Sequence, residues 1–411
     1  MKDKNARILK IIVVVLALVL VAELIYFGVR SYNNRKNSVF STVMNGIVML
    51  SDDKYVGAGY SDYRHSDFND YEKGYNKATI SLVNDEKVVK EVGFKKGYNS
   101  YFNDVIKVSD GYVAVGSVEM TKEQFEEQTS EGLVIKYDKN FKLVWRKNIS
   151  GIGKTEFVRV KATKSGDLVL VGTSVYASGY VGNHTTGGGI LVRLDKDGKE
   201  KFRVNNAGPY NGRFNDVLLE DGGYVVVGLG KKNSGVIIKY DMKGKKLWSG
   251  SYGYTDKNGI VAVEKLGNNY VVATTKMVDP NKTSNYTGAI ALFNAKGKKI
   301  DDVNYSVSDI TIFNDLVVDK DKNIIATGST GKLKDGSLSS DGFIVKFDKD
   351  LYEISSDVLK ESNNDNYGKI YLEEDDLYVL GYSNSKLEKD VYKFNGYDYF
   401  PFIREYDLDL K

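Results

Sequence analysis

The sequence contains no cysteine, only three prolines and only two histidines among its 411 residues. The absence of cysteine excludes disulfides, thiolate metal sites, a cysteine nucleophile and a lipid anchor built on an N-terminal cysteine. The two histidines, His65 and His184, are too few and too scattered for a histidine-rich zinc site or an obvious Ser-His-Asp triad. The net charge is only +3, so the chain has no global field that would attract nucleic acid.

Glycine and tyrosine, in contrast, are abundant, with 41 and 30 residues. This bias is typical of chains with many tight turns and many β-strands. A unit of about 45 to 58 residues recurs along the chain, and a period in this range indicates a propeller, solenoid or array. Its clearest copy runs from Asp221 to Trp248 and reads DGGYVVVG, then GVIIKYDMKGKKLW. Seven copies fill residues 42–411.

Each copy supplies four short strands rich in Val, Ile, Leu and Tyr, separated by Asp- and Gly-containing turns. Four antiparallel strands repeated radially make a β-propeller blade. The sequence therefore predicts an all-β fold, a seven-bladed β-propeller of four-stranded antiparallel blades. A solenoid of stacked hairpins is the alternative, but atypical capping units would then be expected at its ends. The terminal copies are only degraded, which suits a closed ring.

The N-terminal segment predicts one transmembrane helix ahead of the propeller. Residues 1–10 are basic and Ile11 to Val29 are apolar except for Glu23. Nineteen helical residues span about 28 Å, close to the hydrocarbon core of a bilayer. A cleavable signal peptide is the alternative. We expect a cytoplasmic N-terminus at residues 1–10, an anchor at 11–29, a polar linker at 30–41, and a single-pass protein of the cell membrane with its propeller outside the cytoplasm.

Insertions between the second and third strands of the units suggest where a partner binds. These connections vary in length and sequence, whereas the other turns are short, and binding residues tend to lie on loops held by a rigid frame. Aromatic residues gather in the variable loops, and exposed tyrosine suits recognition of peptides or sugars. Packing against the neighbouring blade is the alternative role for each ring. The candidate binding residues are Tyr60, Tyr63, Phe68, Tyr71, Tyr75, Tyr176, Tyr180 and Tyr286.

An Asn-Asp pair recurs at the start of the first strand of three units. The three carboxylates are those of Asp104, Asp216 and Asp315. Because the first strand of a blade is normally innermost, these side chains are predicted to ring the mouth of the central channel. Converging carboxylates could hold Ca²⁺. Hydrogen bonding to backbone, as Asn and Asp do in turns, is the alternative. No other metal or cofactor is indicated.

The units resemble the repeats of bacterial extracytoplasmic β-propellers, loosely the quinoprotein-like repeats, over about residues 42–408. The motif from Asp221 to Trp248 carries the resemblance. It implies the propeller scaffold and an extracytoplasmic location. It does not extend to the vicinal cysteines of quinoprotein dehydrogenases or to the Ser-x-Asp-x-Gly-x-Thr-Trp box of sialidase-like propellers.

Taken together, the sequence predicts a membrane-anchored binding or scaffolding module whose loop face engages a protein partner or a cell-envelope glycan, with no nucleic-acid partner. The alternative is a glycan-active enzyme, a lyase or hydrolase, that uses Tyr and acidic residues on that face. A sensor or assembly factor that works through the membrane helix is a third possibility, for which Glu23 is the only indication.

Overall fold

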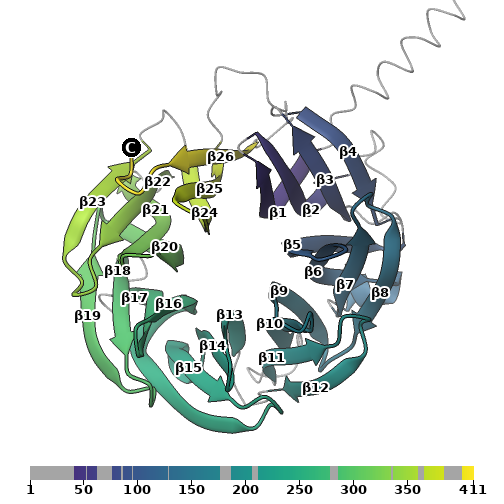
Figure 1. Ribbon diagram of the computed structural model, residues 1–411, viewed down its shortest axis with the longest axis horizontal. Helices are drawn as coiled ribbons and strands as arrows, with labels where there is room; N and C mark the ends of the chain where they lie inside the picture. Colours follow the sequence, from purple (N-terminus) through teal and green to yellow (C-terminus); the bar gives the residue numbers. More distant parts are fainter. Residues whose placement is uncertain are drawn as a thin grey trace, which may run out of the picture.

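The structure, a computed structural model, describes residues 41–51, 53–62, 76–84, 87–94, 96–127, 129–175, 187–205, 212–277, 286–334, 337–359, 365–383 and 400–411. These residues form antiparallel β-sheets arranged like the blades of a propeller around a central opening (Figure 1). The predicted anchor and linker lie outside the described residues. Across the residues that are described, no helix has the length and hydrophobicity needed to cross a bilayer.

Three sheets have four strands each, and each is a simple antiparallel meander. The first contains β1 (Ser41–Ser51), β2 (Lys54–Asp62), β3 (Asn76–Asn84) and β4 (Lys87–Gly93). The second contains β5 (Asn99–Val108), β6 (Gly111–Glu119), β7 (Glu131–Asp138) and β8 (Leu143–Ile149), with the short helix α2 (Lys122–Glu126) between β6 and β7. The third contains β9 (Lys154–Ala162), β10 (Leu168–Val175), β11 (Gly187–Leu194) and β12 (Glu200–Asn205).

A fourth sheet has eleven strands and a fifth has three. The fourth begins with β13 (Arg213–Glu220), β14 (Gly223–Leu229), the 3₁₀ turn η1 (Lys231–Asn233), β15 (Ser234–Tyr240) and β16 (Lys246–Leu266). It continues with β17 (Asn269–Met277), β18 (Tyr286–Phe293), β19 (Lys299–Tyr305), β20 (Ile310–Val318), β21 (Ile324–Lys334), β22 (Ser337–Phe347) and β23 (Glu353–Val358). The fifth contains β24 (Asp365–Glu373), β25 (Asp376–Ser383) and β26 (Phe400–Tyr406).

The hydrogen bonding therefore differs from the predicted seven separate four-stranded sheets. β16 is 21 residues long, and it pairs with β15 through its first half and with β17 through its second half. A single parallel bridge between Tyr286 and Ile310 then joins β18 to β20. These two continuities merge successive meanders into one hydrogen-bonded sheet. A further difference lies between β21 and β22, where the sequence predicts an insertion between the second and third strands of a unit. These two strands instead extend as a hairpin to Lys334 and Ser337.

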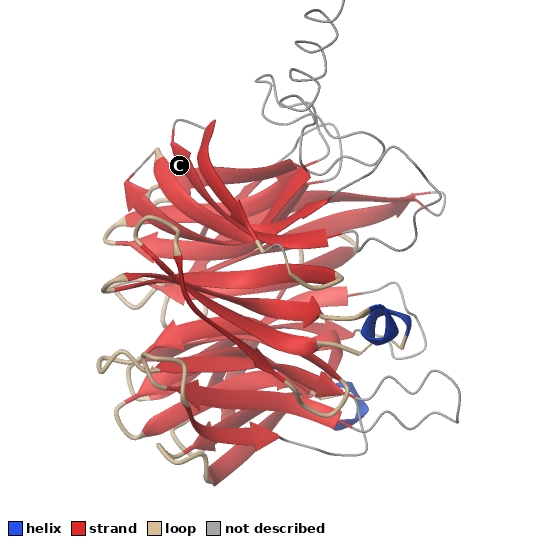
Figure 2. Cartoon of the chain, turned by 90° about the vertical axis from the view of Figure 1, so that its right-hand side faces the viewer, coloured by secondary structure: helices blue, strands red, loops and turns tan. Residues whose placement is uncertain are grey.

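The ring has an inner edge, an outer edge and two unlike faces. β1, β5, β9, β13, β20 and β24 lie around the opening, and β4, β8, β12, β19 and β23 lie at the rim (Figure 1). Figure 2 shows the short turns gathered along one side of the molecule and α2 on the other. We call these the short-turn face and the loop face. The loop face carries the connections β2–β3, β6–β7, β10–β11 and β17–β18.

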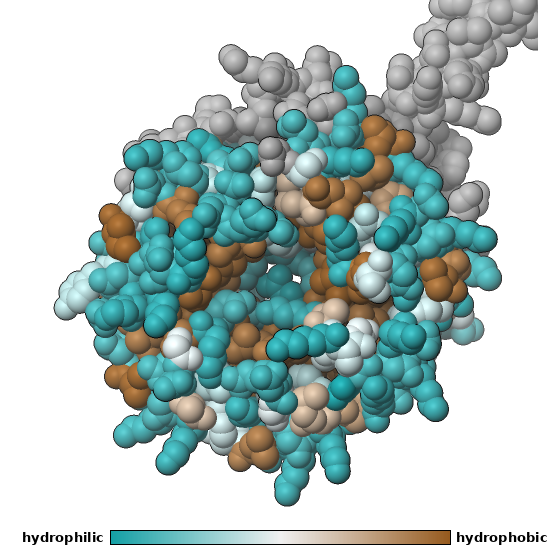
Figure 3. Space-filling model, in the orientation of Figure 1, coloured by the Kyte–Doolittle hydropathy of each residue, from teal (hydrophilic) through white to brown (hydrophobic). Residues whose placement is uncertain are grey.

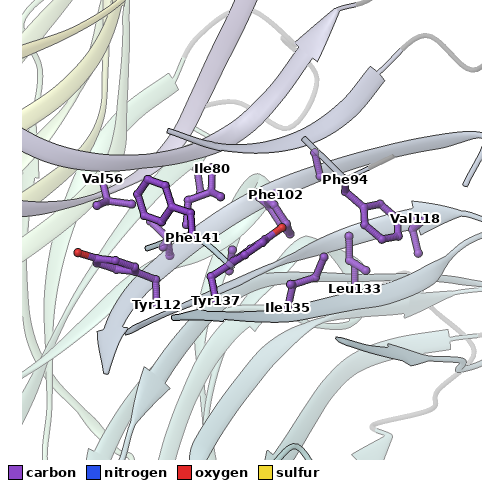
Figure 4. Close-up of a cluster of buried hydrophobic side chains, with 14 residues drawn as sticks. Val56, Ile80, Phe94, Phe102, Tyr112, Val118, Leu133, Ile135, Tyr137 and Phe141 are labelled. Atoms are coloured by element: carbon purple, nitrogen blue, oxygen red, sulfur yellow. The ribbon is translucent and has the colours of Figure 1, made fainter. Parts of the chain in front are cut away.

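The core consists of layers of apolar side chains between successive sheets. Figure 4 shows one layer, in which Val56 and Ile80 of the first sheet meet Phe102, Leu133 and Ile135 of the second. Burial of such side chains removes apolar area from water and is the main stabilising contribution to the fold. The ring closes by the same means, because Ile47 and Met49 of β1 pack against Tyr378 and Leu380 of β25.

Glycines in the third strands allow these layers to pack closely. A Cβ on Gly132 would lie 2.4 Å from the ring of Phe157, which belongs to the following sheet. Gly189 and Phe214 are related in the same way, with a Cβ-to-ring distance of 2.5 Å. The two tryptophans serve the same purpose near the rim. Trp248 lies against Gly297 of the following unit, where a Cβ would lie 2.4 Å from the indole.

The turns on the short-turn face owe their shape to a recurring aspartate. Oδ1 of Asp195 accepts hydrogen bonds from the backbone N–H groups of Asp197 and Lys199, at 3.0 and 2.8 Å. Gly198 in that turn has φ +84°, which favours glycine. The same pattern recurs at Asp241, and the Asp side chain thus replaces backbone partners inside a tight turn.

Candidate functional site

Each inner strand contains an irregularity of one residue at the same place. In β5 the register shifts between Phe102 and Asp104, so Asn103 is left without a Cα partner on β6. This is a β-bulge, which bends the strand and redirects its side chains. The same shift recurs at Met44/Gly46, Phe157/Arg159, Phe214/Asp216, Ile260/Ala262, Phe313/Asp315 and Tyr367/Lys369.

Glycine on the second strand makes the bulge possible. Gly228 pairs with Phe214, and a Cβ on Gly228 would lie 1.9 Å from the carbonyl oxygen of Arg213. Gly116 has the same relation to the carbonyl oxygen of Tyr101, also at 1.9 Å. The glycine in the repeated VVVG and VAVG strings is therefore required by the close approach of two backbones.

In four of the seven inner strands the bulged residue is an asparagine, and it joins its strand to the next one around the ring. Nδ2 of Asn103 donates to the carbonyl oxygen of Phe157, at 2.9 Å. The same bond joins Asn215 to Ile260 at 2.8 Å and Asn314 to Tyr367 at 2.7 Å. The neighbouring aspartate adds a second link, since Asp216 Oδ2 accepts from the backbone N–H of Val263 at 3.1 Å. Hydrogen bonding to backbone was one of the two roles predicted for the pair, and these contacts confirm it.

The second oxygen of the aspartate faces a cluster of charges at the centre of the ring. Arg159 reaches two carboxylates, with Nε 3.3 Å from Asp216 Oδ1 and Nη2 3.2 Å from Asp315 Oδ1. β9 and β20, which carry Arg159 and Asp315, lie on opposite sides of the opening (Figure 1). Lys369 Nζ lies 2.8 Å from Asp104 Oδ1 and also donates to the backbone carbonyl of Asn103. The three predicted aspartates are therefore brought together, each with a cation beside it.

Two further charged residues, Lys161 in β9 and Glu264 in β16, lie two positions after the residue that follows the bulge. Lys161 Nζ is 3.6 Å from both Asp216 Oδ1 and Glu264 Oε1. Burial opposes the charged form of Lys161, but the carboxylates of Asp216 and Glu264 outweigh burial and raise its pKa. Burial also raises the pKa of Glu264 and of Asp315, and it lowers the pKa of Lys369. We call these seven residues the central charge cluster: Asp104, Arg159, Lys161, Asp216, Glu264, Asp315 and Lys369.

The predicted Ca²⁺ role of the aspartates finds no support in this geometry. Within the described ranges, no group of three or more His, Cys, Asp or Glu side chains is arranged to hold a metal ion. The carboxylates of Asp104, Asp216 and Asp315 instead face Arg159 and Lys369. Whether the aspartates bind any ligand stays a prediction.

The cations of the cluster were not identified from the sequence, although a signal was present. Arg159 follows Phe157 by two residues, as Asp104 follows Phe102, and Lys369 follows Tyr367 in the same way. Alignment of the repeats on the aromatic residue therefore places all of them at one position of the bulge. The two copies with a positive charge have no Asn-Asp pair, since Val158 and Gly368 stand where the asparagine would be.

On the loop face, two of the eight predicted aromatic residues lie in the described part of the chain. Tyr60 is half-buried, and its ring meets that of Tyr101 edge to face with 6.4 Å between centroids. Tyr286 begins β18 and is also half-buried. The other six, together with most of the variable loops, fall outside the described residues: Tyr63, Phe68, Tyr71, Tyr75, Tyr176 and Tyr180. Their role in binding stays a prediction.

Near the short-turn face, ion pairs join the strands of several units. Asp167 is almost fully buried and accepts from Arg193 Nη2 and Lys201 Nζ, both at 2.6 Å. Arg193 also donates to Tyr224 Oη of the next sheet, at 2.9 Å. Burial alone would raise the pKa of Asp167, but the hydrogen bonds from Lys201 and Arg193 outweigh burial and lower it. This group holds adjacent sheets together.

No model of a known protein family matches the chain, and no curated protein matches it. Among solved structures, the chain is similar to Sqt1 from Chaetomium thermophilum, with 10% identity, 83% of this chain and 94% of that chain covered, and a TM-score of 0.42. It is similar to a lignostilbene dioxygenase from Pseudomonas brassicacearum, with 10% identity, coverage of 84% and 86%, and a TM-score of 0.43. It is also similar to an acylaminoacyl peptidase from Pyrococcus horikoshii, with 10% identity, coverage of 82% and 48%, and a TM-score of 0.39. Identities and scores this low assign neither a family nor an activity.

Proposed function

We propose that the chain is a seven-bladed β-propeller that serves as a binding or scaffolding module at the outer side of a cell membrane. The seven recurring bulges support the number of blades, since each marks one inner strand. On this basis the eleven-stranded sheet contains three blades. The first two share β16, and the bridge from Tyr286 to Ile310 joins the second to the third.

The observation that carries the binding role is the difference between the two faces. On the short-turn face the hairpins close within a few residues and repeat one Asp-centred turn. In the sequence the insertions fall between the second and third strands of the units, and α2, which is part of one of them, lies on the loop face. A rigid ring that varies on one face only is the usual arrangement of a scaffold that presents binding loops. The partner we propose is a protein or an envelope glycan, and the anchor is the apolar segment 11–29.

The experiment uses the full chain, purified in detergent, as bait for an extract of cell envelopes. A variant carries a Gly-Ser linker in place of residues 63–75, between β2 and β3. A matched control carries the same linker in place of residues 121–127, which include α2. A protein or glycan retained by the wild type and by the control, but lost with the first variant, supports the proposal and locates the site. Equal retention by all three baits contradicts a site at the first insertion.

A further inference from the structure

The centre of the short-turn face is hollow, and the inner strands determine what lines it. In each inner strand, consider the residue that directly follows the bulged one, such as Asp104 in β5. The residue two positions further along lies on the same side of the strand, because side chains alternate along a strand. Four of these residues are aliphatic and three are polar. In ring order they are Val48, Ile106, Lys161, Leu218, Glu264, Val317 and Tyr371.

Figure 3 shows this hollow at the centre of the face, with hydrophobic residues along its border and hydrophilic residues deeper inside. Leu218 lies between Lys161 and Glu264 in the ring. Tyr371 Oη accepts a hydrogen bond from the backbone N–H of Ile47, at 3.1 Å. We call this space the central hollow, with the central charge cluster as its floor and the aliphatic side chains as its wall.

The floor carries an excess of negative charge. The cluster contains four carboxylates and three cations, so one negative charge is left when all seven groups are ionised. The acid with the weakest compensation is Glu264, whose one ion pair is with Lys161 at 3.6 Å, too long for a hydrogen bond. Burial raises the pKa of Glu264, which agrees with a carboxylate that lacks a close partner.

A second group in the floor also lacks a hydrogen bond. Asp216 has a side chain that is only 5% exposed. Its Oδ1 lies 3.3 Å from Arg159 Nε and 3.6 Å from Lys161 Nζ, but it makes no hydrogen bond within the described part of the chain. Oδ2 of the same carboxylate accepts from Val263, so Oδ1 is the oxygen left for a ligand. A buried carboxylate oxygen without a hydrogen bond is costly and favours a ligand that donates one.

We propose that the central hollow binds a primary ammonium group on an aliphatic stem. The ammonium would donate to Glu264 and to Asp216 Oδ1, and the stem would lie along Leu218 and the aliphatic wall. An ammonium fits because it supplies both the missing positive charge and the missing donors. A carboxylate or phosphate would add to the negative excess. Such an ammonium is found on a lysine side chain of a partner protein and on a free polyamine.

The test measures binding by isothermal titration calorimetry on the full chain in detergent. The probes are n-pentylamine, pentanol and pentanoate, which share a stem and differ in charge. We expect n-pentylamine to bind and the other two to bind at least about tenfold more weakly. Glu264→Gln and Asp216→Asn should each weaken n-pentylamine binding by a similar factor. Glu127→Gln, an exposed change on the opposite face, should leave it unchanged.

Two further probes distinguish the sources of the ammonium. Tighter binding of a short lysine-containing peptide than of cadaverine indicates a partner protein, and the reverse order indicates a free polyamine. Equal binding of n-pentylamine, pentanol and pentanoate overturns the proposal. So does unchanged binding of n-pentylamine to the Glu264→Gln variant, provided that the variant melts at the same temperature as the wild type. This site is on the short-turn face and includes no part of the insertions on which the proposed function rests, so its failure leaves the proposed function untouched.

Discussion

At the scale of single residues, a few positions in the repeat are fixed by contact with backbone. The glycine opposite six of the seven bulges is one, since a side chain there would meet backbone atoms of the facing strand; Thr274 takes this place only in β17. The asparagine found at four of the bulges is another, because its amide bonds to the next inner strand. The residue after the bulged one is freer, and it is acidic, basic or small in different copies.

Gly228→Ala is expected to destabilise the fold strongly. The new Cβ would lie 1.9 Å from the carbonyl oxygen of Arg213, so either β13 or β14 must move. Overpacking of this kind costs about 3 kcal/mol or more. Gly222→Ala is the matched control, because nothing lies within 4 Å of its Cβ, and it should change the free energy of unfolding by less than about 0.5 kcal/mol. Denaturant unfolding of both variants checks the difference, and equal stability would contradict the bulge argument.

Asp167→Asn is expected to lower stability at pH 7 by about 3 kcal/mol, because it leaves Arg193 and Lys201 without their carboxylate. The pKa of Asp167 is lowered in the folded state, so its contribution is present above the unfolded value of about 4 and is lost as the pH falls through the folded pKa. The stability gap between wild type and variant should therefore shrink below about pH 4. Thermal melting from pH 3 to 7 measures it, and a gap that is constant with pH contradicts the role of the charge.

At the scale of strands, the hairpins of each unit could be predicted from the sequence, but the continuation of a strand from one unit into the next could not. The Asp-Gly turns and alternating Val, Ile and Tyr residues identified the hairpins correctly, because those signals are local. The continuity of β16 depends on how residues 250–260 pass from one unit to the next, and no turn residue marks such a passage. The hairpin extension to Lys334 and Ser337 was likewise mistaken for a loop, because its residues are polar.

The links between inner strands give a test at this scale. Asn215→Ala removes two hydrogen bonds to the next inner strand, to the carbonyl oxygens of Asn258 and Ile260. Loss of the donor leaves these carbonyl groups unsatisfied, and we expect about 2 kcal/mol of destabilisation. Asn268→Ala, at an exposed turn, should have almost no effect. Urea unfolding compares the two, and similar midpoints would mean that the asparagine links contribute little.

At the scale of the whole molecule, the ring joins residues that are far apart in sequence. Arg159 and Asp315 are 156 residues apart, and they meet across the opening. The sequence placed Asp104, Asp216 and Asp315 at the channel but gave no means of pairing them, because which units face one another depends on closure of the ring. Alignment of the repeats could have predicted that Arg159 and Lys369 lie at the channel, but it could not have predicted which carboxylate each of them contacts.

The proposed topology is testable because the chain has no cysteine. Lys139→Cys places a single thiol at an exposed turn of the propeller, and Asn5→Cys places one ahead of the apolar segment. A membrane-impermeant maleimide added to intact cells should label the first variant, and it should label the second only after lysis. The reverse pattern would put the propeller in the cytoplasm and would remove the envelope partner from the proposal.

The central claim, that the loop face is the binding face, is tested most directly by two exposed tyrosines. Tyr254 lies at the loop-face end of the first half of β16, which pairs with β15, and it is 62% exposed. Tyr352 lies in a turn of the short-turn face and is 73% exposed. Each is replaced in cells by the photo-crosslinking residue benzoylphenylalanine, and adducts are separated by mass after illumination. If the loop face binds the partner, we expect a discrete adduct from position 254 and none from position 352. An adduct from position 352 alone would contradict it.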